Sequence, residues 1–311
     1  MGRTLYQVAQ TVIIVPAMNT NLKDDYVAAL VALGHQGRLS VFRLLVRRVP
    51  DWVPAGELAE ALSLKPSTLS VYVSILSRCG LVQSRREGRS ILYTADLRNV
   101  GDLLGFLVDD CCRGRPEVLA PVMTPRDAPP QEGTGSDRVF NVLFVCSGNS
   151  ARSIFAEAIL QQEGKGLFRA FSAGTRPAGD VNPLALVTLR SEGFDTSALR
   201  PKAIDDFVHD KSLQMDFVFT VCDRAANVDC PPLPGQPVTA HWGVPDPVCV
   251  EGTEAEKAHA FHQAFAMLRD RLSAFMSLPL VTLDRISLQG RLDEIGRHAA
   301  ASGSLPNSPE A

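Results

Sequence analysis

Near its midpoint the sequence reads Val142-Leu-Phe-Val-Cys146-Ser-Gly-Asn-Ser-Ala-Arg152-Ser, and this stretch decides the fold of the C-terminal half. The apolar run that leads into the cysteine, 138–145, is continuous, as expected for a strand covered on both faces. The segment 152–163 is expected to form a helix. The stretch therefore predicts a buried strand, a loop that starts at a cysteine, and a helix that follows the loop.

The residues after this stretch continue to alternate between the two patterns. Further strands are expected at 168–172, 215–221 and 236–241, and further helices at 182–192, 202–208 and 254–275. Strands that alternate with helices are typical of a parallel sheet with helices on both faces. The C-terminal half is therefore expected to be an α/β domain with a four-stranded parallel sheet.

Two domains are expected, because 311 residues exceed what one hydrophobic core usually supports. The stretch 113–137 contains five prolines and can hold neither a long helix nor a central strand, so a linker is expected there. The expected division is an N-terminal extension at 1–23, a first domain at 24–112, this linker, a second domain at 138–280 and a C-terminal tail at 281–311.

The first domain is expected to be mainly α-helical, with a winged helix-turn-helix. Two short helices at 55–62 and 66–76 flank a tight turn, and a hairpin follows at 81–94. Residues 1–120 hold 14 Lys/Arg against 11 Asp/Glu, whereas the remainder holds 17 against 23, which favours a nucleic-acid partner for the first domain. The candidate DNA contacts lie on the second helix and on the hairpin: Ser67, Thr68, Ser70, Tyr72, Arg85, Arg86 and Arg89.

The seven cysteines are spaced unlike those of a small secreted scaffold. The sequence shows no secretion signal and no apolar run of about 18 residues, the length that a membrane span needs. A cytoplasmic protein without a membrane span is therefore expected, in which cysteines are more often catalytic or metal-binding than paired in disulfides.

The loop that begins at Cys146 is expected to bind an oxyanion. Backbone N–H groups of such a loop and of the following helix point at a bound anion, and Arg152 offers a planar fork for two of its oxygens. The same positive field is expected to lower the pKa of the Cys146 thiol, and Ser153 can donate a hydrogen bond to the thiolate. The residues expected to surround the oxyanion are Ser147, Gly148, Asn149, Ser150, Ala151 and Arg152.

The spacing of Cys146, Asn149, Arg152 and Ser153 resembles the signature of the low-molecular-weight tyrosine phosphatases and of the arsenate reductases that share their fold. The resemblance implies that Cys146 is a nucleophile. It also implies that Asp246, in an Asp-Pro pair late in the domain, is the general acid. The phosphatases carry tyrosines directly after that pair, whereas this chain has valine and cysteine, which favours a reductase.

Two further cysteines, Cys222 and Cys230, resemble the redox segment of the thioredoxin-linked reductases. The resemblance implies that Cys222 attacks Cys146 and that Cys230 then attacks Cys222, which leaves a disulfide. Thiol–disulfide exchange of this kind is expected to need a flexible, accessible segment. The expected reductant is external, either thioredoxin or a glutathione/glutaredoxin system, and no tightly bound cofactor is expected.

Residues 24–112 resemble the ArsR family of winged-helix metalloregulators. The resemblance implies a homodimer that binds operator DNA and releases it when an effector binds. Cys111 and Cys112, at the end of the last helix of this domain, are candidate ligands for arsenite, because arsenite prefers thiolates. Some relatives have a third cysteine several residues further on, and this chain does not.

Together these patterns predict a bifunctional arsenic-resistance protein that reduces arsenate and carries an arsenite-responsive repressor domain. Two alternatives remain open at this stage. One is a low-molecular-weight tyrosine phosphatase fused to a DNA-binding regulator, and the other is a non-enzymatic repressor that senses an oxyanion.

Overall fold

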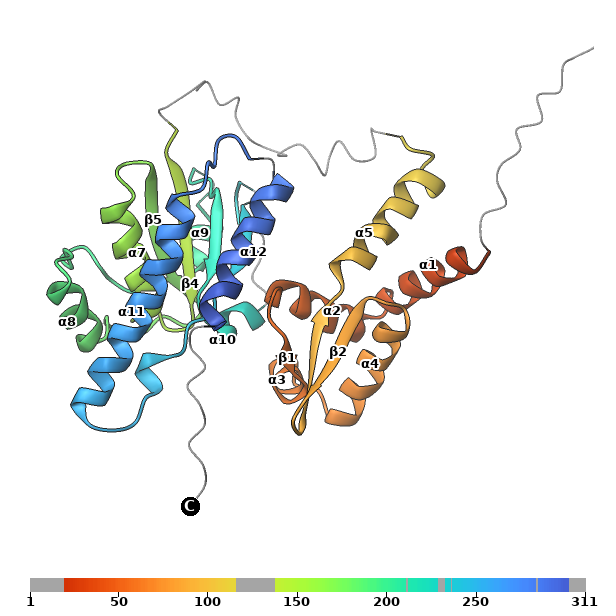
Figure 1. The fold of residues 1–311 in the computed structure, drawn as a ribbon, viewed down its shortest axis with the longest axis horizontal. Coiled ribbons are helices and arrows are strands. Elements are labelled where there is room, and N and C mark those ends of the chain that lie inside the picture. The colour runs from red at the N-terminus through yellow and green to blue at the C-terminus, as the bar shows by residue number, and fades with distance from the viewer. Residues whose placement is uncertain are drawn as a thin grey trace, which may run out of the picture.

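The computed structural model describes residues 20–115, 138–210, 212–228, 233–235, 237–283 and 285–301. These residues form two units, each with its own hydrophobic core (Figure 1). The expected extension and linker fall largely outside the described residues. No described helix combines the length and the apolar character that crossing a membrane requires.

The N-terminal unit is mostly helical. Its elements are α1 (Thr20–Leu33), α2 (Gln36–Arg48), β1 (Val53–Pro54), α3 (Ala55–Ala61), α4 (Pro66–Arg78), β2 (Val82–Glu87), β3 (Ser90–Ala95), α5 (Leu97–Phe106) and the π-helix η1 (Leu107–Cys111). The three strands form an antiparallel sheet in the order β1-β3-β2. Helices α3 and α4 occupy the positions expected for the two short helices, and β2 and β3 that of the hairpin. Buried aliphatic residues of α2, α3 and α4 fill the space between them.

The C-terminal unit alternates strands and helices. Its elements are β4 (Phe140–Cys146), α7 (Arg152–Glu163), β5 (Phe168–Gly174), α8 (Pro183–Ser191), α9 (Asp205–Val208), β6 (Phe217–Thr220), α10 (Asp223–Asn227), β7 (Val238–His241), the 3-10 helix η2 (Pro247–Cys249), α11 (Glu254–Met276) and α12 (Arg285–Ala301). The strands form one parallel sheet in the order β5-β4-β6-β7. This arrangement confirms the predicted four-stranded parallel sheet.

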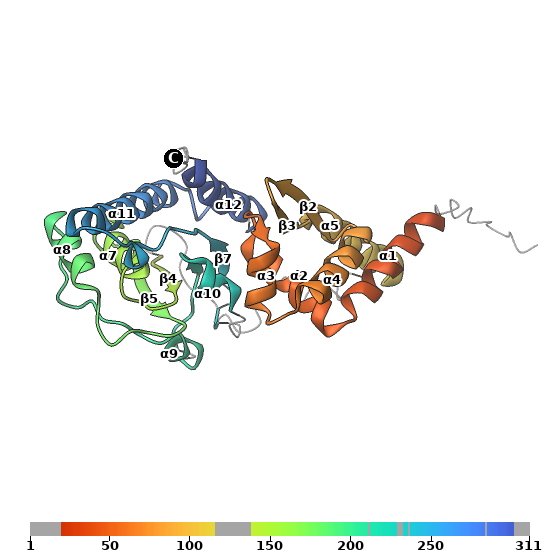
Figure 2. The same ribbon diagram turned by 90° about the horizontal axis from the view of Figure 1, so that it is seen from below.

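Helices cover both faces of this sheet, as the continuous apolar run of β4 predicts. Figure 2 shows α11 and α12 on one side and α9 on the other. Aromatic side chains fill much of the core between sheet and helices. Among them, Trp242 stacks on Phe219 with ring centroids 3.9 Å apart, and both side chains are fully buried. This packing fixes the chain just after β7, from which the next loop starts.

Helix α12 lies in the stretch that the sequence suggested was a tail. Its residues Leu288 and Leu292 are buried in the C-terminal core, and the carbonyl oxygen of Leu292 accepts a hydrogen bond from Trp242 Nε1 at 3.0 Å. The helix packs on β7 and α11. Part of the expected tail is therefore an integral layer of the C-terminal unit.

The strand order determines where a ligand can bind. From β4 the chain passes to β5 on one side and later to β6 on the other, so the direction of winding reverses between β4 and β6. The loops that leave these two strands diverge at the carboxyl edge of the sheet, which opens a crevice there. Cys146 ends β4 and Cys222 follows β6, so both cysteines lie at this edge.

Candidate functional site

The carboxyl edge of the sheet brings together residues from three strands. In the register of the sheet, Cys146 pairs with Gly174, and Thr220 pairs with His241. Cys222 comes two residues after the end of β6. The loops that follow β4, β6 and β7 are therefore neighbours, although they lie up to about a hundred residues apart in the sequence.

The peptide groups of residues 146–152, the cysteine loop, are oriented by the neighbouring segment 175–182. N–H groups of that segment donate hydrogen bonds of 2.8–3.0 Å to four loop carbonyls, those of Cys146, Ser147, Gly148 and Ser150. The C=O and the next N–H of a trans peptide point in opposite directions, so the N–H groups that follow these carbonyls face the inner side of the loop. The N–H of Asn149 shows this orientation, since it donates to Cys146 Sγ at 3.1 Å.

A glycine at the end of β5 allows this close approach. A Cβ atom on Gly174 would lie 2.8 Å from the carbonyl oxygen of Ser147 and 3.1 Å from Cβ of Asn149. Real Cβ atoms do not come so near to backbone, so a larger residue would displace the cysteine loop. The inward orientation of the N–H groups therefore depends on Gly174.

Asn149 holds the cysteine loop in shape from within. Its φ is +47°, in the left-handed region that asparagine tolerates better than most residues. Its Nδ2 donates to Ser153 Oγ at 2.8 Å and to Ser172 Oγ at 2.7 Å, and its Oδ1 accepts from the N–H of Lys202 at 2.7 Å. Because Ser153 Oγ accepts from Asn149, its own proton is free to point at Cys146 Sγ, 2.9 Å away.

Three residues behind this network were not found from the sequence. Ser172 donates to Glu157 Oε2 at 2.6 Å, and the Glu157 carboxylate pairs with Lys202 Nζ at 2.9 Å. They come from α7, from β5 and from the segment before α9, so no local motif unites them. Their contacts fix the side-chain amide of Asn149, and with it the direction of the Ser153 hydroxyl.

The pKa of Cys146 departs from the sequence-based expectation. Burial raises the pKa of this thiol, the neighbouring Cys222 raises it further, and hydrogen bonds from Ser153 and the charge of Arg152 oppose the rise. The expected lowering was wrong because it counted the positive groups and not the loss of water around a side chain that is 3% exposed. Arg152 is also engaged elsewhere, which weakens its effect on the sulfur.

Arg152 pairs with the carboxylate of the Asp-Pro loop. Its Nη2 lies 2.5 Å from Asp246 Oδ2, and its Nη1 donates to the carbonyl oxygen of Val244 at 3.0 Å. Next to this pair is a cavity of about 410 Å³. Its lining consists of Asp51, Arg152, Cys222, Asp223, Arg224, Gly243, Val244, Pro245, Asp246 and Cys249. Cys146 is not among these lining residues, whereas Arg152, Asp246 and Cys222 are.

Cys222 is buried against the cysteine loop and does not lie on an exposed segment. It is 2% exposed, and its Sγ lies 3.5 Å from Ser147 Oγ. It is the N-cap of α10, and its sulfur accepts a hydrogen bond from the N–H of Ala225 at 3.3 Å. The expectation of an accessible segment therefore does not hold for Cys222 in this conformation, and Cys230 lies outside the described residues.

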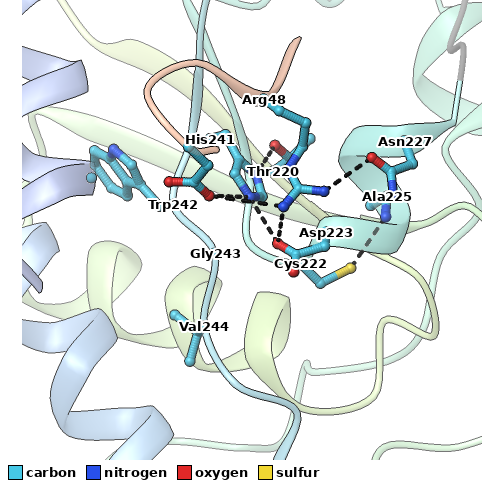
Figure 3. Close-up of polar contacts among 12 residues, drawn as sticks. Arg48, Thr220, Cys222, Asp223, Ala225, Asn227, His241, Trp242, Gly243 and Val244 are labelled. Atoms are coloured by element: carbon cyan, nitrogen blue, oxygen red, sulfur yellow. Dashed lines mark hydrogen bonds and ion pairs between the residues drawn. The ribbon is translucent and has the colours of Figure 1, made fainter. Parts of the chain in front are cut away.

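A charged cluster between the two units was also not found from the sequence (Figure 3). His241 Nε2 lies 3.0 Å from Asp223 Oδ1 and 3.4 Å from Asp51 Oδ2, and these three residues have the geometry of a metal site. However, Arg48 Nη2 lies 3.2 Å from Asp223 Oδ1 and already balances the negative charge. The hydrogen bond with His241 lowers the pKa of Asp223, whereas burial raises that of Asp51. The cluster is therefore an ion-pair network.

The candidate residues of the N-terminal unit lie on two elements. Ser67 and Ser70 are exposed on α4 and Thr68 is half-buried, whereas Tyr72 is half-buried with its ring 5.1 Å from that of His35. The three arginines Arg85, Arg86 and Arg89 are exposed on the β2–β3 hairpin. Cys111 is exposed and Cys112 half-buried at the end of η1.

Comparisons with known proteins agree on the C-terminal unit. Residues 141–286 match the family model described as low molecular weight phosphotyrosine protein phosphatase. An arsenate reductase of Bacillus licheniformis is 35% identical over 43% of this chain and 93% of its own length, and one of Bacillus subtilis is 34% identical over the same shares. A solved arsenate reductase from Archaeoglobus fulgidus is 26% identical over 44% of this chain and 99% of its own, with a TM-score of 0.36.

Proposed function

The C-terminal half of the chain belongs to the arsenate reductases of the low molecular weight phosphatase family, and we propose that it reduces arsenate through a relay of Cys146, Cys222 and Cys230. The observation that carries the proposal is the position of Cys222, whose Sγ lies 3.5 Å from the Ser147 hydroxyl of the cysteine loop. A second thiol beside the oxyanion loop has no use in hydrolysing a phosphate ester. It is what a two-electron reduction requires.

The cysteine loop is the arsenate site in this proposal. Arsenate is a tetrahedral oxyanion, and inward N–H groups at a helix N-terminus suit such an anion. The loop supplies these groups at Ser147, Gly148, Asn149 and Ala151. We expect Ser150 and Arg152 to contribute to the same site. Arg152 leaves Asp246 and turns its fork to two arsenate oxygens.

The reaction then proceeds in three exchanges. The Cys146 thiolate attacks arsenic, and Asp246 protonates the hydroxide that leaves, so water forms. The Cys222 thiolate attacks Cys146 Sγ; a disulfide forms, the sulfur–arsenic bond breaks, and its electron pair stays on arsenic as arsenite. Cys230 attacks Cys222 and frees Cys146. The sum is arsenic acid and two thiols giving arsenous acid, water and one disulfide.

An external dithiol protein closes the cycle by reducing the Cys222–Cys230 disulfide. Thioredoxin and glutaredoxin are the two candidates, and no bound cofactor is needed. The test is arsenate-dependent NADPH consumption with each reductant system in parallel, for the wild-type chain and for Cys222→Ser. We expect Cys222→Ser to lose reduction while it retains slow hydrolysis of p-nitrophenyl phosphate. Reduction that survives in Cys222→Ser would refute the relay.

We also propose that the N-terminal unit is a winged helix that binds operator DNA as a homodimer and is released by arsenite at Cys111 and Cys112. The order of its elements and the exposed arginines of the β2–β3 hairpin support this proposal. The test is a gel-shift titration with Cys146→Ser, which cannot make arsenite. Arsenite, but not arsenate, is expected to release the DNA, and release by arsenate would contradict the proposal.

A further inference from the structure

The helix that follows Cys222 is stabilised by the N-terminal unit (Figure 3). Helix α10 has five residues, and a helix so short is not stable without tertiary contacts. It packs against α2 of the N-terminal unit. Because Cys222 is the N-cap of α10, the orientation of its thiol depends on the contacts that hold this helix.

The C-terminal end of α10 is bound by two consecutive arginines at the end of α2. Arg47 donates from Nε to the carbonyl oxygen of Ala226 at 3.0 Å and from Nη2 to that of Asn227 at 3.3 Å. Such carbonyls have no partner within their own helix. The side chain of Asn227 accepts from Arg48 Nη1 at 3.1 Å and donates to Glu57 at 2.9 Å.

Arg48 also contacts the other end of α10. Its Nη2 lies 3.2 Å from Asp223 Oδ1, the same oxygen that lies 3.0 Å from His241 Nε2. Its Nη1 pairs with Glu57 in its own unit. One guanidinium therefore joins the first and last residues of α10 to the N-terminal unit. Arg48 is 3% exposed, whereas the side chain of Asp223 is 54% exposed, so solvent reaches this ion pair from the carboxylate side only.

We propose that Arg48 is a positioning residue for arsenate reduction, contributed to the active site by the N-terminal unit. The inference rests on the relay proposed above. Cys222 must approach Cys146 Sγ in line with the bond that breaks, and α10 sets that approach. The contacts of Arg48 recorded among the described residues lie on α10 and in its own unit, so its loss is expected to slow the thiol exchange and leave oxyanion binding intact.

The test compares Arg48→Met with Arg98→Met in the full-length chain. Arg98 is an exposed arginine of the same unit, on α5, and serves as a matched control. Each reduced protein is mixed with excess arsenate without reductant and quenched at intervals in denaturant with N-ethylmaleimide. Mass spectrometry then gives the rate at which the Cys222 thiol disappears. Separately, inorganic phosphate is titrated for protection of Cys146 from iodoacetamide, which reports oxyanion binding.

We expect the rate of Cys222 consumption in Arg48→Met to fall by about 10- to 100-fold, the cost of a misplacement of about 1 Å. Arg98→Met is expected to match wild type. Half-protection by phosphate is expected to shift less than about two-fold in both variants, because Glu57, Asp223 and Asn227, the partners of Arg48, lie outside the cysteine loop. An unchanged rate in Arg48→Met would overturn the inference. A parallel loss of phosphate protection would overturn it too, because it would mark a general structural role.

Asn227→Ala is a second, milder variant that tests the same inference. It removes the contact between α10 and Arg48 from the other side, while Arg48 keeps Glu57 and Asp223 as partners. It is expected to slow the same step by a smaller factor. If Arg48→Met does not fold, an unchanged rate in Asn227→Ala overturns the inference. If arsenate fails to consume the Cys222 thiol in wild type, the relay itself is wrong and the inference falls with it, which is a distinct outcome.

Discussion

Replacement of Asn149 by alanine is expected to destabilise the C-terminal unit by about 4 kcal/mol. The asparagine is fully buried, and its side chain makes three hydrogen bonds of 2.7–2.8 Å, to Ser153, Ser172 and the backbone of Lys202. At about 1 kcal/mol each, their loss amounts to about 3 kcal/mol. Its φ of +47° adds roughly 1 kcal/mol, because alanine tolerates the left-handed region poorly.

Urea unfolding followed by the fluorescence of Trp242 measures this loss. A Trp52→Phe background makes Trp242 the sole tryptophan, and its full burial in the C-terminal core makes it a probe of that unit alone. Asn182→Ala is the matched control, since it removes one cap hydrogen bond of 2.9 Å at α8 and should cost about 1 kcal/mol. If Asn149→Ala costs no more than Asn182→Ala, the network around the cysteine loop does not carry the stability assigned to it.

Three further predictions concern other contacts of the C-terminal unit. Ser153→Ala removes the side-chain hydrogen bond that lowers the pKa of Cys146 and keeps the backbone one, so that pKa rises further and the pH midpoint of iodoacetamide alkylation moves upward; a midpoint that stays or falls would disprove the role of the hydroxyl. Asp246→Asn should reduce kcat for arsenate by about 100-fold, as expected for loss of a general acid. In the same variant phosphate should protect Cys146 at lower concentration, because Arg152 no longer has a competing carboxylate. Weaker protection by phosphate would contradict this competition. Arg271→Met should cost about 3 kcal/mol in urea unfolding, because it leaves three backbone carbonyls without their donor, and Arg271→Lys should recover part of that loss.

The central elements of the C-terminal unit could be predicted because their signals are local. An apolar run broken only by Asn141 marks β4, and the cysteine that ends it marks the start of a loop at the carboxyl edge. The expected helix from 152 to 163 has the observed bounds of α7. The parallel orientation of the strands follows from the alternation of strands and helices. The sequence pattern therefore predicts the strands and helices, and the individual residues that lie at the carboxyl edge of the sheet.

Features that depend on contacts between distant segments could not be predicted from the sequence pattern. Helix α10 is too short to show helical periodicity, and its contacts with Arg48 join residues 179 positions apart in the sequence. The network of Glu157, Ser172 and Lys202 is likewise assembled from three separate segments. The pKa of Cys146 was misjudged for a related reason, since burial is a property of the folded core and not of the motif.

The contact between α2 and α10 bears on why two such units share one chain. Coupling free energies are reciprocal. If α2 stabilises one placement of Cys222, that placement of Cys222 stabilises the corresponding position of α2 by the same free energy. Helix α2 is anchored in the N-terminal core by Leu44 and Leu45, both fully buried, so a displacement at Arg48 is not absorbed locally. We therefore expect a ligand that shifts this core to change the equilibrium placement of Cys222, and oxidation of Cys222 to change the affinity for that ligand.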